Sequence, residues 1–267
     1  MKVILSRKGF DSANGGIASP ILPDGTLLSL PIPGSNKDRV YSEARYNDHR
    51  TYEDIIKQLK PTFDKPFGGH DPDIRQSVYV NPPVDWKPAF GQCGSSQTHL
   101  HKQGIGKDDL FLFFGWFRQT EENNGKLRYI PKSPDIHIIF GYLQIGDMIT
   151  EQIDIRRDYS WHPHANLNIA NNCLYIPRDK LSWNDKIPGY GVFSYDKRLV
   201  LTKDSMTRSS WKLPDFFKKI NITGQYKNPW RTDPQHGEYF RVMDIGQEFV
   251  IEENDEVTAW AKSLIEG

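Results

Sequence analysis

The apolar run Leu110-Phe111-Leu112-Phe113-Phe114 most restricts what this 267-residue chain can fold into. Five consecutive large apolar side chains, reached through Lys107-Asp108-Asp109, predict a strand that is buried in the protein. Gly115 follows the run directly and predicts a bulge or a bend in this strand. The sequence therefore predicts a sheet with this segment inside it.

Other short apolar runs predict further strands, at residues 2–6, 26–32, 137–143, 174–176, 190–195, 199–202 and 249–251. The first two of these are expected to pair. A turn is expected at Ile145-Gly146-Asp147, and Gly141 is expected to allow close backbone approach. Helices are predicted at residues 49–60, with Thr51 and Asp54 as a capping pair, and at residues 255–265, which carry one apolar stripe.

The order of these elements favours one fold class. The strands are not regularly separated by helical patterns, which argues against a doubly wound parallel sheet. Residues 65–107 are rich in Gly, Pro and Asp and are predicted to be mostly loop. We expect a single α+β domain over residues 1–267, with a mixed or largely antiparallel curled sheet, few flanking helices and long loops.

Charge and cysteine content bound the partners and the compartment. The 34 Lys and Arg residues are balanced by 34 Asp and Glu residues, so any contact with nucleic acid has to use a local basic patch. The two cysteines do not form a disulfide framework, which favours a reduced, cytoplasmic protein. Residues 1–6 are too short an apolar run for a signal peptide, and no stretch is long enough to cross a bilayer.

The densest potential chemistry lies between Gly68 and Arg118, in loops beside the buried strand. His70, Asp71 and Asp73 follow a double glycine and combine an imidazole with two carboxylates. Such a group can transfer protons, or a carboxylate can stabilise positive charge on a sugar ring. The alternative interpretation is an Asx-type turn, since Asp and Pro are turn residues.

The following polar segment, residues 92–101, has three interpretations. As a loop it can cradle a phosphate or another polar ligand, with binding candidates Cys93, Ser95, Ser96, Gln97 and His99. Two other interpretations concern Cys93. It is either a nucleophile that a neighbouring histidine activates, or an inert buried thiol. His99 and His101 lie on one face of an extended segment and can bind a divalent metal; His162-Pro163-His164 repeats their spacing. Local hydrogen bonding is the alternative for all four histidines.

Basic residues interleaved with aromatic residues form three further clusters. Such clusters can bind phosphates and bases of nucleotides, or they can be solvated surface charge. The ligand-binding candidates among them are Arg7, Lys8, Arg45 and Arg157, with Trp116 as a stacking ring and Asp11 as a further catalytic carboxylate. Dinucleotide-binding, Walker A and Gly-x-Ser-x-Gly motifs do not occur in the sequence.

Several segments resemble one protein family over essentially the whole chain. These segments are residues 1–12, 15–17, 19–21, 68–73, 92–100, 141–147 and 260–265. They are similar to the third of the nucleotide-modification-associated domain families of bacteria and their phages. The resemblance implies an α+β fold and an association with DNA base modification, and it assigns no catalytic residue. Residues 108–114 and 143–147 are also similar to strand openings of PUA-like barrels, which bind modified bases, as an analogy only.

We consider three functions. The first is an enzyme acting on a base, a nucleotide or an N-glycosidic or glycosyl linkage, of transferase or glycosidase type, in DNA modification or phage defence. Asp71 or Asp73 is then the reacting carboxylate, and His70 is its proton-transfer partner. The second is a non-catalytic reader that encloses a modified base between aromatic rings, with Phe10, Trp116, Tyr159 and Trp161 as its lining. The third is a metal-dependent hydrolase or nuclease that uses His99 and His101.

Overall fold

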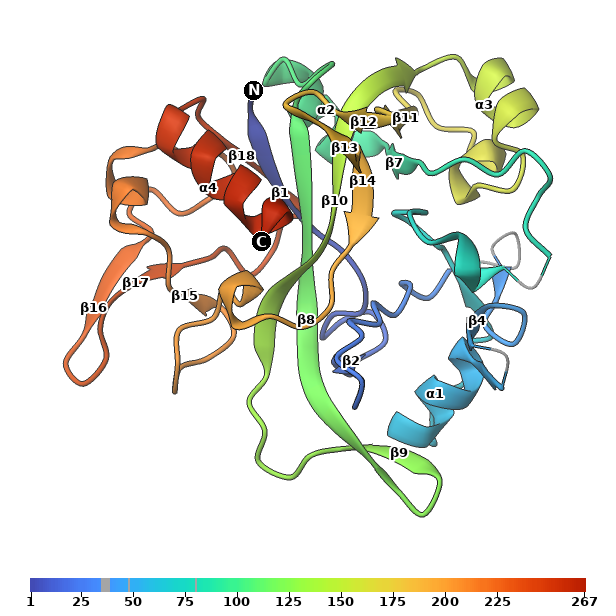
Figure 1. Cartoon of the computed structure of the whole chain (residues 1–267), viewed down its shortest axis with the longest axis horizontal. Coiled ribbons are helices and arrows are strands. Elements are labelled where there is room, and N and C mark those ends of the chain that lie inside the picture. The colour runs from blue at the N-terminus through green and yellow to red at the C-terminus, as the bar shows by residue number, and fades with distance from the viewer. Residues whose placement is uncertain (35–38, 48, 80) are drawn as a thin grey trace.

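The computed structural model describes residues 1–34, 39–47, 49–79 and 81–267. Its centre is a mixed, strongly curled sheet whose main path runs β18-β1-β8-β10-β11-β7 (Figure 1). The strands β2 and β9 pair with β8, and β14 pairs with β10. The sheet strands are β1 (Val3–Arg7), β2 (Ser19–Ile21), β7 (Phe90–Gln92), β8 (Leu110–Asn123), β9 (Lys126–Tyr129), β10 (Ile136–Ile149), β11 (Cys173–Pro177), β14 (Tyr190–Val192) and β18 (Glu248–Ile251).

Short sheets and helices surround the central sheet (Figure 1). The helices are α1 (Tyr52–Leu59), α2 (Gly94–Lys102), α3 (Gln152–Asp158) and α4 (Asp255–Glu266), with 3₁₀ turns η1 (Gln76–Val78), η2 (Pro163–Asn166), η3 (Lys197–Leu199) and η4 (Asp215–Lys219). The outer strands are β3 (Arg39–Val40), β4 (Arg45–Asn47), β5 (Arg50–Thr51), β6 (Phe67–Gly68), β12 (Lys180–Leu181), β13 (Asn184–Pro188), β15 (Ser210–Trp211), β16 (Trp230–Asp233) and β17 (Gly237–Arg241).

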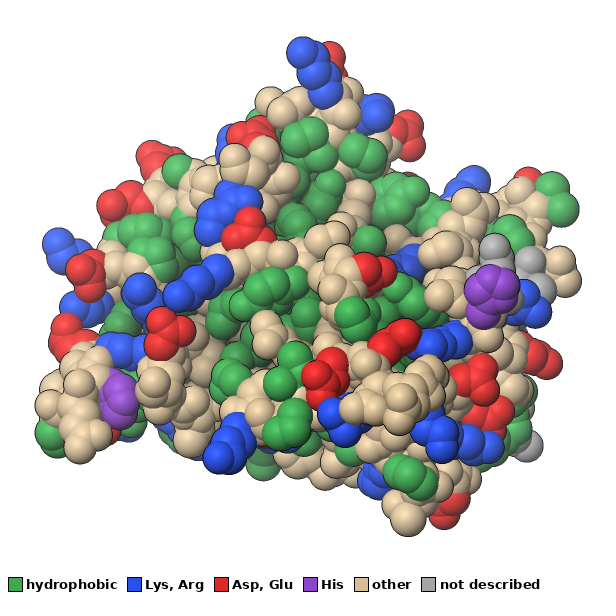
Figure 2. Space-filling model, turned by 60° about the horizontal axis from the view of Figure 1, so that its bottom comes forward, with side chains coloured by type: hydrophobic (Ala, Val, Ile, Leu, Met, Phe, Trp, Pro, Cys, Tyr) green, Lys and Arg blue, Asp and Glu red, His purple; other side chains and the backbone are tan. Residues whose placement is uncertain are grey.

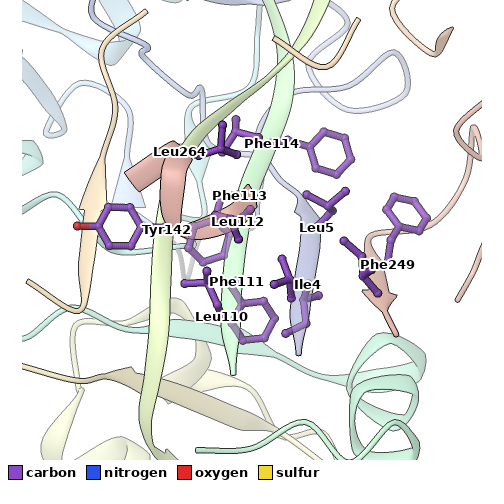
Figure 3. Close-up of a cluster of buried hydrophobic side chains, with 14 of the residues drawn as sticks. Ile4, Leu5, Leu110, Phe111, Leu112, Phe113, Phe114, Tyr142, Phe249 and Leu264 are labelled. Atoms are coloured by element: carbon purple, nitrogen blue, oxygen red, sulfur yellow. The ribbon is translucent and has the colours of Figure 1, made fainter. Parts of the chain in front are cut away.

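The long strands β8 and β10 form the spine of the sheet, and the apolar run of β8 explains why. Its residues from Leu110 to Phe114 are completely buried, and on one side they pair in parallel with β1, from Val3 to Arg7. On the other side they pair antiparallel with β10. Figure 3 shows these side chains packed with those of β1, β18 and α4. This part of β8 has strand neighbours on both edges and apolar side chains on both faces, and it is therefore completely buried.

The curl brings the two ends of the sheet path together. Gln92 ends β7, at one end of the path, and its side-chain amide donates a 2.7 Å hydrogen bond to Glu248, which begins β18 at the other end. Two strands that are separated by four others in the order therefore meet through their side chains. The sheet is a half-barrel, and the α+β class with a mixed curled sheet, as predicted from the sequence, is confirmed.

Several of the predicted elements are confirmed, with different lengths. The predicted strands at residues 2–6, 110–114, 137–143, 174–176 and 249–251 correspond to β1, β8, β10, β11 and β18. The capping box at the start of α1 forms as predicted, because the Thr51 hydroxyl accepts from the backbone of Asp54 and the Asp54 carboxylate accepts from that of Thr51. Gly141 does permit close approach, since a Cβ there would lie 2.9 Å from the carbonyl oxygen of Gly191.

Other predictions are wrong. Residues 26–32 form isolated bridges instead of a strand, and β1 pairs with β8 and β18. Residues 199–202 contain the end of η3 and isolated bridges. The register shift expected at Gly115 lies across the ladder, between Ile139 and Gly141, and residues 145–147 form a second shift within β10 instead of a turn. Residues 94–102, predicted as loop, form α2.

Candidate functional site

A buried ion pair lies where β1, β7 and β18 meet. Lys8 follows β1 directly, and its ammonium nitrogen is 2.9 Å from Oε1 of Glu248. The same oxygen accepts from the Ser6 hydroxyl at 3.0 Å and from Gln92 Nε2 at 2.7 Å. The Lys8 and Glu248 side chains are 6% and 1% exposed. Burying two charges is costly unless donors and acceptors surround them, which is the arrangement seen at Oε1.

One carboxylate oxygen of this ion pair is not hydrogen-bonded by the described residues, and the ammonium makes one further contact. Glu248 Oε2 is buried and has no hydrogen-bond partner among the described residues. The Lys8 ammonium also lies 4.3 Å from the centre of the Phe90 ring, which stabilises its charge from a second side. The pair is thus held firmly while one carboxylate oxygen stays unused.

Asp71 lies at a partly exposed position of the same region and faces two histidines. It is in the loop after β6 (Phe67–Gly68), and its Oδ1 accepts a 2.8 Å hydrogen bond from the backbone of Gly91. Nε2 of His162 is 3.6 Å from Oδ1, and Nε2 of His164 is 3.8 Å from Oδ2. The Asp71 side chain is 18% exposed, more than those of His162 (0%) and His164 (10%).

Gly91 makes the approach of His164 possible. A Cβ at this position would lie 2.3 Å from the His164 ring, a distance that real Cβ atoms do not show. Gly91 is in β7, one residue before Gln92, so the same short strand supports both Asp71 and the ion pair. Any side chain at Gly91 would push the imidazole away from the carboxylate.

The hydrogen-bond network fixes the tautomers of the two histidines. The Asn172 amide nitrogen donates to Gln152 Oε1 at 2.7 Å and to the His164 carbonyl at 2.9 Å, so its oxygen faces His164 Nδ1 at 2.6 Å. His164 Nδ1 must therefore carry the proton, and its Nε2 presents a lone pair toward Asp71. His162 has the opposite tautomer, because its Nδ1 accepts from the His164 backbone N–H at 3.2 Å. His162 Nε2–H then points toward the Asp71 carboxylate.

The electrostatics of the site favour a charged carboxylate beside a neutral imidazole. Burial raises the pKa of Asp71, but the polar contact with the His162 ring and the electrostatic effects of His164, His162 and Lys8 outweigh burial, so the pKa lies below its usual value. Burial lowers the pKa of His164, against the opposing effect of Asp71. At neutral pH the site therefore holds an unprotonated Nε2 within 3.8 Å of a carboxylate oxygen.

Cys93 is electrostatically coupled to this site. It follows Gln92 and precedes α2, and its side chain is partly exposed. Burial, followed by the Asp71 charge, raises the pKa of its thiol, against the effect of Lys8. A thiol with a raised pKa is protonated at neutral pH and is a weak nucleophile, which favours a contact role over covalent chemistry.

A small cavity lies on the other side of Asp71. Its volume is about 40 Å³, enough for one or two water molecules and too small for a base. Its lining includes Gly9, Tyr52, His70, Asp71 and Asp73. The three acid–base residues predicted after the double glycine thus lie along one cavity, with Asp71 between that cavity and the two histidines.

His70 and Asp73 are much more buried than Asp71. Burial lowers the pKa of His70 to about 3, its ring lies edge-on to Tyr52, and its Nε2 has no partner among the described residues. Burial raises the pKa of Asp73 to about 6, even though its Oδ2 accepts from the Tyr79 hydroxyl and from Trp86 Nε1. Asp73 also exchanges backbone hydrogen bonds with Ala89, one residue before β7. These contacts position the Asp71 loop against β7.

The ligand cradle predicted for residues 92–101 is a helix in the structure. Ser95 is exposed on its first turn next to Ser96, and the buried Gln97 accepts a 2.8 Å hydrogen bond from the Tyr175 hydroxyl. His99 Nε2 is 2.8 Å from the Thr223 hydroxyl, whereas His101 is exposed. Residues two apart on a helix point in different directions, so the two imidazoles do not share a face. The described residues contain no group of three or more potential metal ligands.

The basic candidates lie in separate places. The Arg7 guanidinium donates to the backbone carbonyls of Met243 and Asp244, and burial lowers its pKa to about 10. Arg45 is part of the short strand β4, and Arg157 pairs with Asp154 and Asp158 on exposed α3. Of the four predicted phosphate ligands, Lys8 is the one that belongs to the buried polar site.

The remaining candidates have local structural contacts. Asp11 caps a turn by accepting from the backbone of Ala13 and Asn14. The rings proposed for a reader pocket are dispersed: Phe10 packs on Tyr41 and Phe63, Tyr159 on Trp161, and Trp116 lies under the Arg208 guanidinium.

Sequence reasoning missed part of the site. Its unpredicted members are Ser6, Gln92, Gln152, His162, His164, Asn172 and Glu248. The His162-Pro163-His164 spacing was the one available signal, and the proline begins the 3₁₀ turn η2 that directs both rings inward. No local pattern marks Glu248, which reaches Lys8 by strand pairing across the whole length of the chain.

Comparison with known proteins identifies the family. The model of the family described as nucleotide modification associated domain 3 matches residues 2–252, so this chain belongs to that family, as the sequence motifs predicted. Neither a curated protein nor a solved structure matches the chain. The similarity to PUA-like barrels therefore stays an analogy. None of the helices in the described part of the chain has the length and apolar character needed to span a membrane.

Proposed function

We propose that this chain is an enzyme that modifies a base or a nucleotide, with Asp71 and His164 at its reacting centre. One observation carries the proposal: an ionised carboxylate and the free Nε2 of a neutral imidazole face each other at 3.8 Å, at the partly exposed edge of a buried polar network. The family name, which refers to nucleotide modification, supports the substrate class.

The site is complementary to a hydrogen-bond donor. Two acceptors that face each other, Asp71 Oδ2 and His164 Nε2, repel each other when nothing lies between them. A substrate group with two hydrogens, such as an exocyclic amine of a base, or a hydroxyl of a sugar, relieves this repulsion by donating to one or both. Apolar ligands gain nothing from this arrangement.

The geometry supports general-base catalysis by His164. A proton moves from the bound amine or hydroxyl to Nε2, while Nδ1–H continues to donate to Asn172. The Asp71 carboxylate stabilises the imidazolium that forms, and His162 and the Gly91 N–H hold the carboxylate in place. As this proton moves, the substrate nitrogen or oxygen attacks the electrophilic atom of a second substrate, a group donor. The bond from that atom to its leaving group breaks, and the leaving group takes the bonding electrons and the proton from the imidazolium. In an N-glycosidic reaction, the same carboxylate stabilises positive charge on the sugar.

The proposal is tested by mass spectrometry of nucleosides after DNA or nucleotides are incubated with the protein. Asp71→Asn and His164→Gln keep side-chain size, and each is expected to reduce turnover by about 10²- to 10⁴-fold. His99→Gln, outside the site, is the matched control and should keep wild-type turnover. Release of a free base identifies N-glycosidic cleavage, and a mass increase on the nucleoside identifies transfer. Full turnover in both site variants would remove the assignment.

The imidazole tautomers provide a test that needs no substrate. Imidazole ¹⁵N spectra at neutral pH should show His164 protonated at Nδ1 and His162 protonated at Nε2. Asn172→Ala removes the acceptor for His164 Nδ1 and should mix its tautomers. A His164 that is protonated at Nε2 in the wild-type protein would contradict its role as the base.

A further inference from the structure

A second and larger hollow lies near the N-terminal end of β10, where Ile136 begins the strand. Its volume is about 460 Å³, which is the size of a small-ligand pocket. Figure 2 views the molecule from this end of the long strands, where hydrophobic side chains gather in the middle of the face among charged side chains of both signs. The lining combines apolar side chains with four cationic ones, Lys197, Arg198, Lys203 and Lys212.

The hollow carries a local positive charge in a chain with balanced charge. Four lining residues are cationic and one, Asp204, is anionic. Asp204 is 3.8 Å from Lys197, and both side chains are about four-fifths exposed, so they neutralise each other weakly. Lys203 donates to the backbone carbonyl of Glu238, and Lys212 has no side-chain partner among the described residues. Lys197, Lys203 and Lys212 therefore remain available to an anion.

The apolar part of the lining determines what kind of anion fits. Ile136, Val200, Met206 and the ring of Tyr195 offer surface for a flat apolar group beside the lysines. A nucleotide combines such a group, the base, with a phosphate. Duplex DNA presents mainly phosphates at its surface and keeps its bases stacked, whereas a single strand can insert a base into a hollow.

The hollow lies close to the Asp71 side of the protein. Ile136 lines the hollow and Phe140 lines the small cavity next to Asp71, and both residues belong to β10. Four residues of a strand span about 13 Å. Ile21 of the hollow also forms a β-bridge with Leu27 of the cavity, so neighbouring segments line the two spaces.

We propose that this hollow binds a nucleotide unit of single-stranded nucleic acid, with the base on the apolar floor and the phosphate between Lys197, Lys203 and Lys212. This inference rests on the proposed function for the identity of the ligand and deepens it, because it makes a polynucleotide the substrate. It also places the local basic patch that a chain of zero net charge requires.

Fluorescence anisotropy with a labelled single-stranded DNA oligonucleotide tests the inference. The variant Lys197→Gln/Lys212→Gln removes two charges from the hollow and should weaken binding at low salt by at least about tenfold. The slope of log affinity against log salt should also decrease in magnitude by up to about 0.7, because the variant weakens the contact with one phosphate, and each phosphate contact on a single strand contributes about 0.7. The matched control, Lys126→Gln/Lys219→Gln, removes two exposed lysines that do not line the hollow and should leave affinity and slope unchanged.

The outcomes separate this inference from the proposed function. Equal weakening in both double variants, or none in either, overturns the hollow as the binding site. Equal affinity for a mononucleotide and the oligonucleotide shows a free nucleotide to be the ligand, and preference for duplex DNA also overturns the inference. Loss of oligonucleotide binding in the Lys197/Lys212 variant supports it, whatever the turnover. The proposed function is judged separately, by turnover in Asp71→Asn and His164→Gln.

Discussion

Two buried regions of this protein contain opposite kinds of side chain, one aromatic and one charged. Around Phe111 and Phe113, side chains from β7, β8 and β11 pack ring against ring, with ring centres 4.9 Å apart for Phe90 and Phe111. Around Lys8 and Glu248, which are also buried, and the partly exposed Asp71, the groups are charged. Phe90 belongs to both regions, because its ring also contacts Lys8. The comparison can therefore be made within one short segment of the fold.

The difference separates the region that stabilises the fold from the region in which we place the proposed function. Burying a Phe side chain stabilises a fold by about 2–3 kcal/mol. A buried ion pair is often no better than apolar residues of the same shape, so its presence is weak evidence for a role in stability. Glu248 Oε2 and His162 Nε2, which have no hydrogen-bond partner in the part of the chain that the structure describes, add to the cost. Departures of this kind from good packing concentrate at functional sites.

The largest expected effect tests the ion pair. Glu248→Leu leaves Lys8 buried without a counter-charge and removes the acceptor for Ser6 and Gln92, so we expect a loss of about 5 kcal/mol in the free energy of unfolding. The double variant Lys8→Met/Glu248→Leu removes both charges and should recover most of this loss. Urea denaturation of the single and double variants measures the difference. A double variant as unstable as the single one would show that the pair itself stabilises the fold.

The second-largest expected effect tests how much the aromatic region around Phe111 stabilises the fold. Phe111→Ala deletes a fully buried ring that contacts Phe90, Phe113 and Tyr175, and should lower the free energy of unfolding by about 4 kcal/mol. Val84→Ala, at a fully exposed position, should change it by less than about 0.5 kcal/mol. Chemical denaturation measures both. If Phe111→Ala costs no more than its exposed control, the apolar region does not supply the stability that we assign to it.

Whether a feature of either region could be predicted from the sequence depends on how far apart along the chain its interacting residues lie. The apolar run 110–114 must be buried wherever it lies, so β8 was predictable from five residues. The capping box at Thr51 was predictable because its hydrogen bonds span three residues. In contrast, α2 begins with Gly94 and two serines, which are poor helix formers, and tertiary contacts such as Gln97 with Tyr175 hold it.

The site was predictable only where its chemistry is local. Asp71 stands out because a carboxylate next to a histidine in a glycine-rich loop is an unusual local combination. Its actual imidazole partners, His162 and His164, are about ninety residues away, and Glu248 meets Lys8 through the pairing of β1 with β18. The curl of the sheet creates these contacts, and curl is a property of the whole chain. The sequence therefore singled out the Asp71 loop, whereas it did not reveal the residues that contact it.

The third effect concerns pH and separates Asp73 from Asp71, which lie on the same loop but have opposite pKa shifts. Burial raises the pKa of Asp73 to about 6 from 3.8, so between these values the folded protein keeps a proton that the unfolded chain has released. The wild-type protein should thus lose stability as the pH rises from about 4 to about 6, and change little from this source above that. Asp73→Asn removes this dependence.

The size of this effect follows from the shift. Two pKa units correspond to about 3 kcal/mol, so the free energy of unfolding of the wild type relative to Asp73→Asn should fall by about that amount between pH 4 and pH 7. Asp64→Asn removes an exposed carboxyl upstream of the same loop and is the matched control. Urea denaturation at several pH values measures the difference. A difference that rises with pH would mean that folding lowers the pKa of Asp73, and that its contacts with Tyr79 and Trp86 outweigh its burial. Asp73 would then resemble Asp71, and the contrast between a reacting and a positioning carboxylate would have to rest on exposure alone.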